Sequence, residues 1–249
     1  MRGPVEIVPG VYGLGTDMVN WYLVEDGGRL TAVDAGLPGF RETLDSDLRA
    51  IGHGIGDVEA VVLTHCDSDH TGLANAFKEA GARVLIHSAD ERRLRKPGPK
   101  SGDASPLRML SITWRPGAIR LFGHFAKYGG ARPPAVEPTA TFAYGDRLDV
   151  SGHPRVVPTP GHTEGHCALH FEGRGALFAG DALCTWHPIS GRTGPQLMPA
   201  AFNVSNDQAL RSLSAIEAID AQALLVGHGA PWHDGPAAAA KRAREIGRT

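Results

Sequence analysis

The sequence predicts an α/β protein in which two β-sheets pack face to face and helices cover the outer faces. Three observations support this prediction. The chain has 249 residues, 42% of them hydrophobic, which is enough to bury one sizeable core without disulfides. Short runs rich in β-branched and aromatic residues alternate with segments of helical periodicity. The alternation occurs in two rounds, which is typical of layered sheets with helices outside. We therefore expect one domain over residues 1–249.

The first round predicts a meander of strands followed by a β/α unit. Glycines separate the early strand-like runs, and apolar residues between positions 40 and 51 then recur at steps of four, four and three, as on one helical face. The next apolar run, VEAVVL, predicts a buried strand. The expected elements are strands over 5–15, 19–25 and 30–34, a helix over 39–51, a strand over 58–63, a helix from about 70 to 80 and a strand over 84–87.

The second round follows a long intervening segment and has the same character. Four short strand-like runs come first, and apolar residues between positions 210 and 219 then recur every three residues on one helical face. The expected elements are strands over 141–144, 155–159, 167–172 and 176–179, a helix over 206–219, a strand over 223–226 and a helix over 237–246.

The composition disfavours several classes of protein. The formal net charge is -2, from 25 Lys and Arg against 27 Asp and Glu, which argues against nucleic-acid binding. No window approaches the roughly 18 consecutive apolar residues of a transmembrane helix. Pro4 and Pro9 interrupt the region where a signal peptide has its apolar run. Cys66, Cys167 and Cys184 show no CxxC spacing, which argues against a disulfide framework or a zinc ribbon. We therefore expect a cytoplasmic protein that binds neither membranes nor nucleic acids.

The segment between the two rounds is basic and amphipathic. Residues 90–132 hold ten Lys or Arg and three Asp or Glu. Within residues 97–134, apolar side chains are interleaved with basic ones in a pattern that predicts one or two helices. Such helices can form a lid that receives an acyl chain and an anionic head group of a small-molecule substrate. Charge reversal at Arg115 and Arg120 would then raise KM for an anionic substrate. Alternatively, the apolar stripe packs on the sheets or makes a homodimer contact.

Side chains that can bind metals follow four of the predicted strands. They are imidazoles and carboxylates rather than thiolates, which suits zinc, iron or manganese in an open site. His65 and Asp67 are two residues apart, so both can point the same way on an extended stretch. A helix that begins at about residue 70 would bring backbone N–H groups to Asp69 and His70. The four segments are 64–70 (THCDSDH), 159–162 (TPGH), 179–181 (AGD) and 226–229 (VGHG).

The order of these segments resembles that of the metallo-β-lactamase-fold metallo-hydrolase superfamily, and in particular its glyoxalase II and lactonase-like branch. The family pattern is HxHxDH, followed by a His in a TPGHTxGH-like turn, an Asp in a GD turn and a His in a GHG turn. The match covers nearly the whole chain from about Val5, with an HxDxDH variant of the first motif. The resemblance implies a four-layer αββα sandwich with the metal site at one edge of the two sheets.

The resemblance also implies a ligand set for two divalent metal ions. The implied ligands are His65, Asp67 and His162 for the first site, Asp69, His70 and His228 for the second site, and Asp181 as a bridge between them. Zinc is the ion expected, with iron or manganese as alternatives. His166, in the same turn as His162, would support the site from outside the ligand set.

Asp67 departs from the family pattern, which has a histidine at this position. A carboxylate is a harder, charged ligand, so Asp67 would lower the Lewis acidity at the first site and shift its preference toward iron or manganese. The diiron branch of the superfamily likewise has a carboxylate, Glu, at this position, which makes an iron site conceivable. A third interpretation is that Asp67 does not bind a metal and that only the second site fills.

The function that follows is metal-dependent hydrolysis. The resemblance implies that a metal-bridging hydroxide attacks an ester, thioester or lactone bond, with Asp69 orienting the nucleophile and taking up its proton. β-Lactam hydrolysis is disfavoured, because the commonest β-lactamase subclass has a cysteine ligand where this chain has Asp181. Cys184 replaces a tyrosine of the acyl-homoserine lactonases, which weakens that interpretation. The alternatives are a non-haem iron redox enzyme of the same fold and a non-catalytic metal-binding relative.

Overall fold

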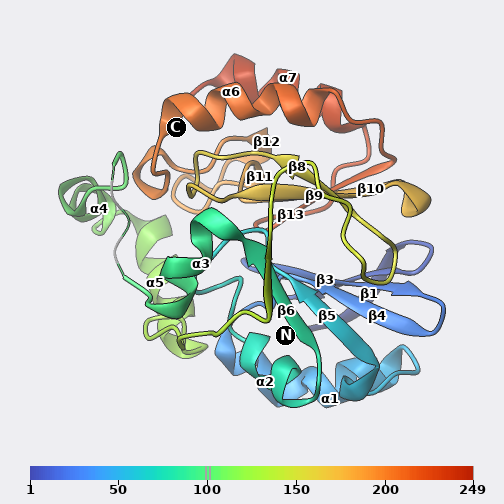
Figure 1. Ribbon diagram of the computed structural model, residues 1–249. Coiled ribbons are helices and arrows are strands. Elements are labelled where there is room, and N and C mark those ends of the chain that lie inside the picture. Colours follow the sequence, from blue (N-terminus) through green and yellow to red (C-terminus); the bar gives the residue numbers. More distant parts are fainter. Residues whose placement is uncertain (99, 101, 249) are drawn as a thin grey trace.

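Two β-sheets lie face to face in this protein, with helices on both outer faces, as Figure 1 shows. The structure is a computed structural model that describes residues 1–98, 100 and 102–248. The predicted αββα sandwich is therefore confirmed. No helix in the described part of the chain combines the length and the apolar character needed to cross a membrane.

The first sheet has seven strands, which follow one another across the sheet in chain order. Strands β1 to β4 pair antiparallel, and β4 to β7 pair parallel. The strands are β1 (Arg2–Val8), β2 (Val11–Gly15), β3 (Asn20–Asp26), β4 (Arg29–Val33), β5 (Val58–Val62), β6 (Arg83–His87) and β7 (Ala140–Phe142). Helices α1 (Arg41–Ala50) and α2 (Ala74–Glu79) cover its outer face, and α3 (Ser88–Arg95) packs beside β6 and β7.

The second sheet has four strands in the order β13-β10-β9-β8, and a separate two-stranded ribbon joins β11 and β12. Only β10 and β13 pair parallel in this sheet. The strands are β8 (Arg155–Pro158), β9 (Cys167–Phe171), β10 (Ala176–Gly180), β11 (Cys184–Trp186), β12 (Thr193–Gln196) and β13 (Ala223–Val226). Helices α6 (Asn206–Glu217) and α7 (Pro236–Ile246) cover the outer face.

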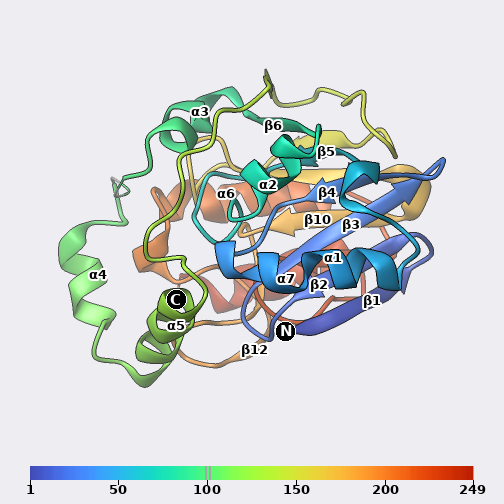
Figure 2. The same cartoon turned by 90° about the horizontal axis from the view of Figure 1, so that it is seen from below.

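The intervening segment forms two helices beside the sandwich. Figure 2 shows α4 (Pro106–Ile112) and α5 (Pro116–Lys127) on one flank rather than on either sheet face. Short 3-10 turns complete the described elements: η1 (Pro38–Phe40), η2 (Ile55–Asp57), η3 (Glu172–Arg174) and η4 (Ala200–Phe202).

Three apolar clusters hold the layers together. One lies between the first sheet and its helices, one lies between the sheets, and one lies between the second sheet and helices α6 and α7. The cluster between the sheets contains Phe178, whose ring centroid is 5.2 Å from those of Tyr22 and Phe171. These edge-to-face rings bury a large apolar area, so they contribute strongly to the packing of one sheet on the other.

Some strands and helices of the structure differ from those predicted from the sequence. The segment over 5–15 forms two strands, because Pro9 cannot donate a ladder hydrogen bond and Gly10 turns the chain at a φ of 75°. Helix α3 and strands β11 and β12 were not expected from the sequence. Each is short, with at most eight residues, so it has too little periodicity to be recognised.

The helix expected from about residue 70 begins only at Ala74. The backbone N–H groups of Gly72 and Leu73 donate to carbonyls of the loop after β4, at 2.8 and 2.9 Å. That loop, rather than helical hydrogen bonding, therefore holds this stretch. The expected contact of Asp69 and His70 with a helix N-terminus is wrong, and a turn positions these two side chains instead.

Leu169 and Leu107 offer a matched test of the packing between the sheets. Leu169 on β9 is fully buried in the cluster between the sheets, whereas Leu107 on α4 is 80% exposed. We expect Leu169→Ala to lower the free energy of unfolding by about 2–5 kcal/mol, because the cavity it leaves cannot fully collapse. Leu107→Ala should change it by less than about 0.5 kcal/mol. Urea denaturation measures both values, and equal effects would contradict the assigned core.

Candidate metal centre

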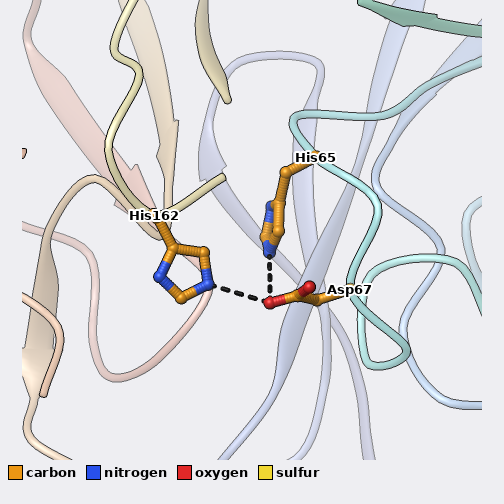
Figure 3. Close-up of side chains that lie close together, drawn as sticks. All are labelled: His65, Asp67 and His162. Carbon is orange, nitrogen blue, oxygen red and sulfur yellow. Dashed lines mark hydrogen bonds and ion pairs between the residues drawn. The ribbon is translucent and has the colours of Figure 1, made fainter. Parts of the chain in front are cut away.

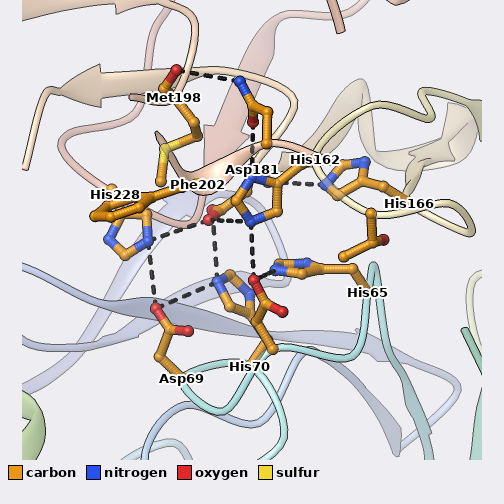
Figure 4. A network of polar contacts seen from close by, with 12 residues as sticks. His65, Asp69, His70, His162, His166, Asp181, Met198, Phe202 and His228 are labelled. Carbon is orange, nitrogen blue, oxygen red and sulfur yellow. Dashed lines mark hydrogen bonds and ion pairs between the residues drawn. The ribbon is translucent and has the colours of Figure 1, made fainter. Parts of the chain in front are cut away.

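Loops that follow four strands meet at one edge of the sandwich. The loops come after β5, β8, β10 and β13, so both sheets contribute. They carry the predicted residues His65, Asp67, Asp69, His70, His162, Asp181 and His228. The structure brings all of these side chains together, as Figures 3 and 4 show between them.

The ligand-type atoms form overlapping clusters in which every atom lies within 4.8 Å of the others. The first cluster is His65, Asp67 and His162, and the second cluster is Asp69, His70 and His228. Asp181 lies between them, since its Oδ2 is 3.4 Å from His162 Nε2 and 3.3 Å from His228 Nε2. This grouping corresponds to the two sites and the bridge that the resemblance implies, and the ligand roles themselves stay predictions.

Each histidine of the two clusters turns its Nε2 atom inward because an oxygen of the protein holds its Nδ1 atom. In His70 this oxygen belongs to the Asp34 carboxylate, at 2.8 Å. The other pairs are His65 Nδ1 with Thr64 Oγ1 at 3.0 Å, His162 Nδ1 with Asn203 Oδ1 at 3.0 Å and His228 Nδ1 with Met18 O at 2.5 Å. Partners of this kind fix the ring orientation and raise the basicity of the free nitrogen.

Asp34 organises the loop after β5. It directly follows β4 in a left-handed conformation, with a φ of 60°, and its side chain is buried. The carboxylate accepts hydrogen bonds from the Thr64 N–H at 2.8 Å and from the Thr64 hydroxyl at 2.9 Å. Because His65 contacts the same hydroxyl and His70 contacts the carboxylate, one buried anion orients two rings. Asp34 was not among the residues predicted from the sequence, although an acidic residue between a buried strand and Gly36 is a usable signal.

Two glycines allow the ligand-bearing turns to approach each other. A Cβ atom at Gly227 would collide with the Asp181 carboxylate and with the His70 ring. At Gly180, where φ is 49°, a Cβ atom would lie 2.6 Å from the Thr64 hydroxyl. The GD and GHG turns therefore need glycine before the ligand-type residue.

The clusters contain buried polar atoms without a hydrogen-bond partner. Within the described chain these include His65 Nε2, His70 Nε2 and Asp181 Oδ1, which belong to one compact group. An unpaired buried polar atom costs about 1–3 kcal/mol, so three that lie together indicate a place for a cation. Imidazole nitrogens and carboxylate oxygens are ligands that divalent transition metals accept. His65, His70 and Asp181 therefore offer atoms that fit a metal ion where the two clusters meet.

The charges around the second cluster lead to the same conclusion. Burial alone would lower the pKa of His70, but the surrounding carboxylates, Asp34 foremost, raise it well above its usual value. Burial would likewise lower the pKa of His228, and Asp181 and Asp69 raise it to about 10. Burial would raise the pKa of Asp181, whereas His228 and His70 lower it well below its usual range. The carboxylates thus attract positive charge to this point, which a divalent ion would supply.

The first cluster contains a lysine that sequence analysis missed. The Lys100 ammonium forms an ion pair with Asp67 Oδ2 and lies 2.9 Å from His162 Nε2. Figure 3 shows His65 and His162 converging on that same Asp67 oxygen, at 3.7 and 3.0 Å. Arg93 Nη2 lies 3.5 Å from the other Asp67 oxygen. Burial would raise the pKa of Asp67, but Lys100 and His162 lower it well below its usual range.

Two further residues of the motifs lie outside the clusters. His166 Nε2 accepts a hydrogen bond from the Asp181 N–H at 3.0 Å, and its Nδ1 lies 2.9 Å from Thr159 Oγ1. Both ring nitrogens are therefore engaged, so His166 supports Asp181 from behind, as the resemblance implies. Cys66 is buried in the apolar cluster between the first sheet and its helices, and it belongs to none of the candidate metal-binding groups.

A cavity of about 530 Å³ lies over the clusters. Asp69, Asp181 and His228 form part of its wall, together with the cationic residues Arg93 and Lys100. Most of the remaining lining is apolar. These apolar residues include Met109, Leu110, Leu121, Phe122, Phe125, Pro188, Met198 and Phe202.

The fold and the clusters define a class, the metallo-hydrolases in which two sheets share one His/Asp centre at their edge. The sequence profile of the Metallo-beta-lactamase superfamily matches residues 14–228, and the chain belongs to this superfamily. The match includes the ligand-type residues of all four motif segments, so the resemblance predicted from those motifs is confirmed.

Individual relatives agree with this assignment. The chain is 24% identical over 263 residues to the "Probable metallo-hydrolase YflN" of Bacillus subtilis, and the alignment covers 91% of this chain and 86% of that protein. It is 38% identical over 170 residues to a hydroxyacylglutathione hydrolase of Rhizobium meliloti, and this alignment covers 68% of this chain and 47% of that protein. The solved structure of the metallo-beta-lactamase family protein TTHA1429 from Thermus thermophilus has a TM-score of 0.69 at 28% identity, over 96% of this chain and 80% of that one.

Asp34→Asn tests the role of the buried carboxylate. The amide keeps the shape of the side chain but removes the negative charge that holds His70 Nδ1. We therefore expect the metal affinity to fall by about 10- to 100-fold. Competition with a chelating dye measures the affinity, and Asp17→Asn, at a side chain that is 83% exposed, is the matched control. An Asp34→Asn protein that binds metal as tightly as the unaltered chain would contradict this role.

Proposed function

We propose that the protein hydrolyses an ester, thioester or lactone bond in a small molecule with an apolar acyl group, using divalent metal. The observation that carries this proposal is the cavity over the clusters, which joins ligand-type side chains to a mainly apolar lining. Sites of this kind bury an apolar substrate and use a few polar groups to orient it. The 38% identical relative is a hydroxyacylglutathione hydrolase, which supports an acyl substrate.

The second cluster supplies the polar groups of the proposed reaction. A bound divalent ion lowers the pKa of water and polarises a carbonyl group. Asp69, His70 and His228, with Asp181, would hold such an ion, and zinc is the ion we propose. Asp69 belongs to this cluster and also lines the cavity, so its carboxylate can orient the attacking water and accept its proton. Its Oδ2 lies 3.3 Å from His228 Nε2, which keeps the carboxylate in place.

The segment over 97–134 supplies much of the apolar lining. Met109 and Leu110 come from α4, and three further side chains come from α5. The cationic residues of the lining, Arg93 and Lys100, both contact Asp67 already. The cavity therefore favours an uncharged acyl group over an anionic head group.

Arg115 and Arg120 do not line this cavity. Arg115 lies 5.9 Å from the ring centroid of Trp114, and Arg120 lies 6.0 Å from that of Trp186. A lid formed by this segment would therefore act through its apolar side chains rather than through these arginines. Charge reversal at the two arginines is no longer expected to change KM.

Metal removal tests the proposed hydrolysis. We expect the purified protein to cleave members of a panel of acyl esters, thioesters and lactones. Prolonged dialysis against a chelator should abolish the activity, because the second cluster then lacks its cation, and stoichiometric zinc or manganese should restore it. Release of acid or thiol measures the rate. Hydrolysis that survives complete metal removal would contradict the proposal, as would oxygen consumption by an iron-loaded protein that cleaves no member of the panel.

Phe122 tests the proposed acyl pocket. It lines the cavity from α5, so Phe122→Ala removes apolar surface that a long acyl chain would contact. We expect KM for an octanoyl substrate to rise about 5- to 10-fold and KM for the acetyl analogue to change little. Ile119→Ala is the matched control, because Ile119 lies on the same helix, is 59% exposed and is outside the cavity lining. Equal effects of Phe122→Ala on both substrates would contradict the assigned pocket.

A further inference from the structure

Lys100 places a positive charge inside the first cluster. Its ammonium contacts Asp67 Oδ2 and lies 2.9 Å from His162 Nε2, and these atoms belong to two of the three residues that would bind the first metal ion. A metal ion bonds imidazole nitrogen and carboxylate oxygen at roughly 2.0–2.2 Å. The space that such an ion needs is therefore the space in which the Lys100 ammonium lies.

Several polar partners hold the Lys100 ammonium in place. A lysine ammonium has three N–H donors. Three acceptors receive them, since Lys100 Nζ contacts Asp67 Oδ2, His162 Nε2 and, at 2.8 Å, the carbonyl oxygen of Phe202. His162 can accept at Nε2 because its Nδ1 faces the Asn203 side-chain oxygen at 3.0 Å. The lysine side chain is only 12% exposed, so these partners replace most of its hydration.

The same contact explains why residue 67 is an aspartate. The family pattern has a neutral histidine there, which suits a divalent ion. A buried ammonium instead needs an anionic partner, because an unpaired buried charge is strongly destabilising. Asp67 is that partner for Lys100, so the departure from the pattern at residue 67 matches the ammonium beside it.

The second cluster has no comparable cation. In the described part of the chain, neither Asp69 nor Asp181 forms an ion pair with a lysine or arginine, and their charged neighbours are histidines. The unpaired atoms His70 Nε2 and Asp181 Oδ1 remain available there. The negative charges of Asp69 and Asp181 balance the charge of one divalent ion. The negative charge of Asp67 is already balanced by the Lys100 ammonium.

We infer that the Lys100 ammonium takes the place of the first metal ion, so that this chain binds one divalent ion, in the second cluster. The protein is then a one-metal member of a fold whose motifs provide for two. The Lys100 side chain is then the second cation of the centre, beside the one divalent ion. This inference concerns the metal content and stands independently of the substrate proposed above.

Metal counting on the intact chain tests the inference. Protein stripped with a chelator is titrated calorimetrically with Zn²⁺, and bound metal is then counted by elemental analysis. We expect one equivalent for the unaltered protein and two for Lys100→Ala, because removal of the ammonium frees Asp67 and His162. With Mn²⁺, the Lys100→Ala protein should show the magnetic coupling of two ions about 3.5–4 Å apart, and the unaltered protein should not.

Arg93→Ala is the matched control. Arg93 contacts the other oxygen of Asp67 and lies outside the first cluster, so its removal lowers the positive charge near Asp67 without opening the metal position. Arg93→Ala should therefore keep one equivalent. Two equivalents in this variant would mean that the charge near Asp67, and not the position of Lys100, limits metal binding, which overturns the inference.

Ligand variants identify the retained site even if Lys100→Ala fails to fold. His228→Ala should lose the single ion, whereas His162→Ala should retain it. Loss of the ion in His162→Ala and its retention in His228→Ala would overturn the inference. Two equivalents in the unaltered protein with affinities within tenfold of each other would also overturn it, as would none. One bound ion in a protein that cleaves no ester, thioester or lactone would refute only the proposed function.

Discussion

The arrangement of the candidate metal centre depends on the hydrogen bonds of the buried Asp34 carboxylate. It is a buried charge at the end of β4, and a buried charge must be paired. Thr64 and His70 satisfy it, and through the Thr64 hydroxyl it also sets the ring of His65. The loop after β5 has no regular secondary structure until Ala74, so these hydrogen bonds replace the order that a helix would provide. The hydrogen bonds offset the cost of burying this anion, and they also orient two ligand-type rings.

A second constraint is that the two sheets must keep a fixed relative position at the edge that carries the clusters. The Tyr22 hydroxyl on β3 donates to the Val226 carbonyl at the end of β13, at 2.6 Å, and the Asn20 amide donates to the same carbonyl at 3.0 Å. Met18 O also holds the ring of His228. These bonds cross from the first sheet to the loop that carries His228 of the second cluster. Packing between the sheets and geometry of the centre are therefore coupled, and loosening one loosens the other.

Most of the fold and of the ligand-type residues could be predicted from the sequence because their signals are local. Apolar runs and helical spacing identify the strands and the longer helices, and short motifs with glycine identify the turns that carry His162, Asp181 and His228. Asp34 and Lys100 were missed because their roles depend on distant contacts. Asp34 lies 30 residues before Thr64, and Lys100 lies 62 residues before His162, in a Pro- and Gly-rich stretch without periodicity. The late start of α2 was missed for the same reason, since carbonyls of the loop after β4 compete for the N–H groups that would begin the helix.

The cavity and the first cluster share one stretch of chain. Residues 97–134 contain both Lys100 and the apolar side chains of α4 and α5 that line the cavity. Helices α4 and α5 of this stretch lie on the flank of the sandwich, in the connection between β6 and β7 of the first sheet (Figures 1 and 2). Such surface connections are where insertions are tolerated. Grafting it onto another member of the superfamily would transfer a lysine together with an apolar cavity wall. Exchange of this module together with an aspartate at position 67 would therefore change, in one step, both the metal content inferred for the centre and the wall of its cavity.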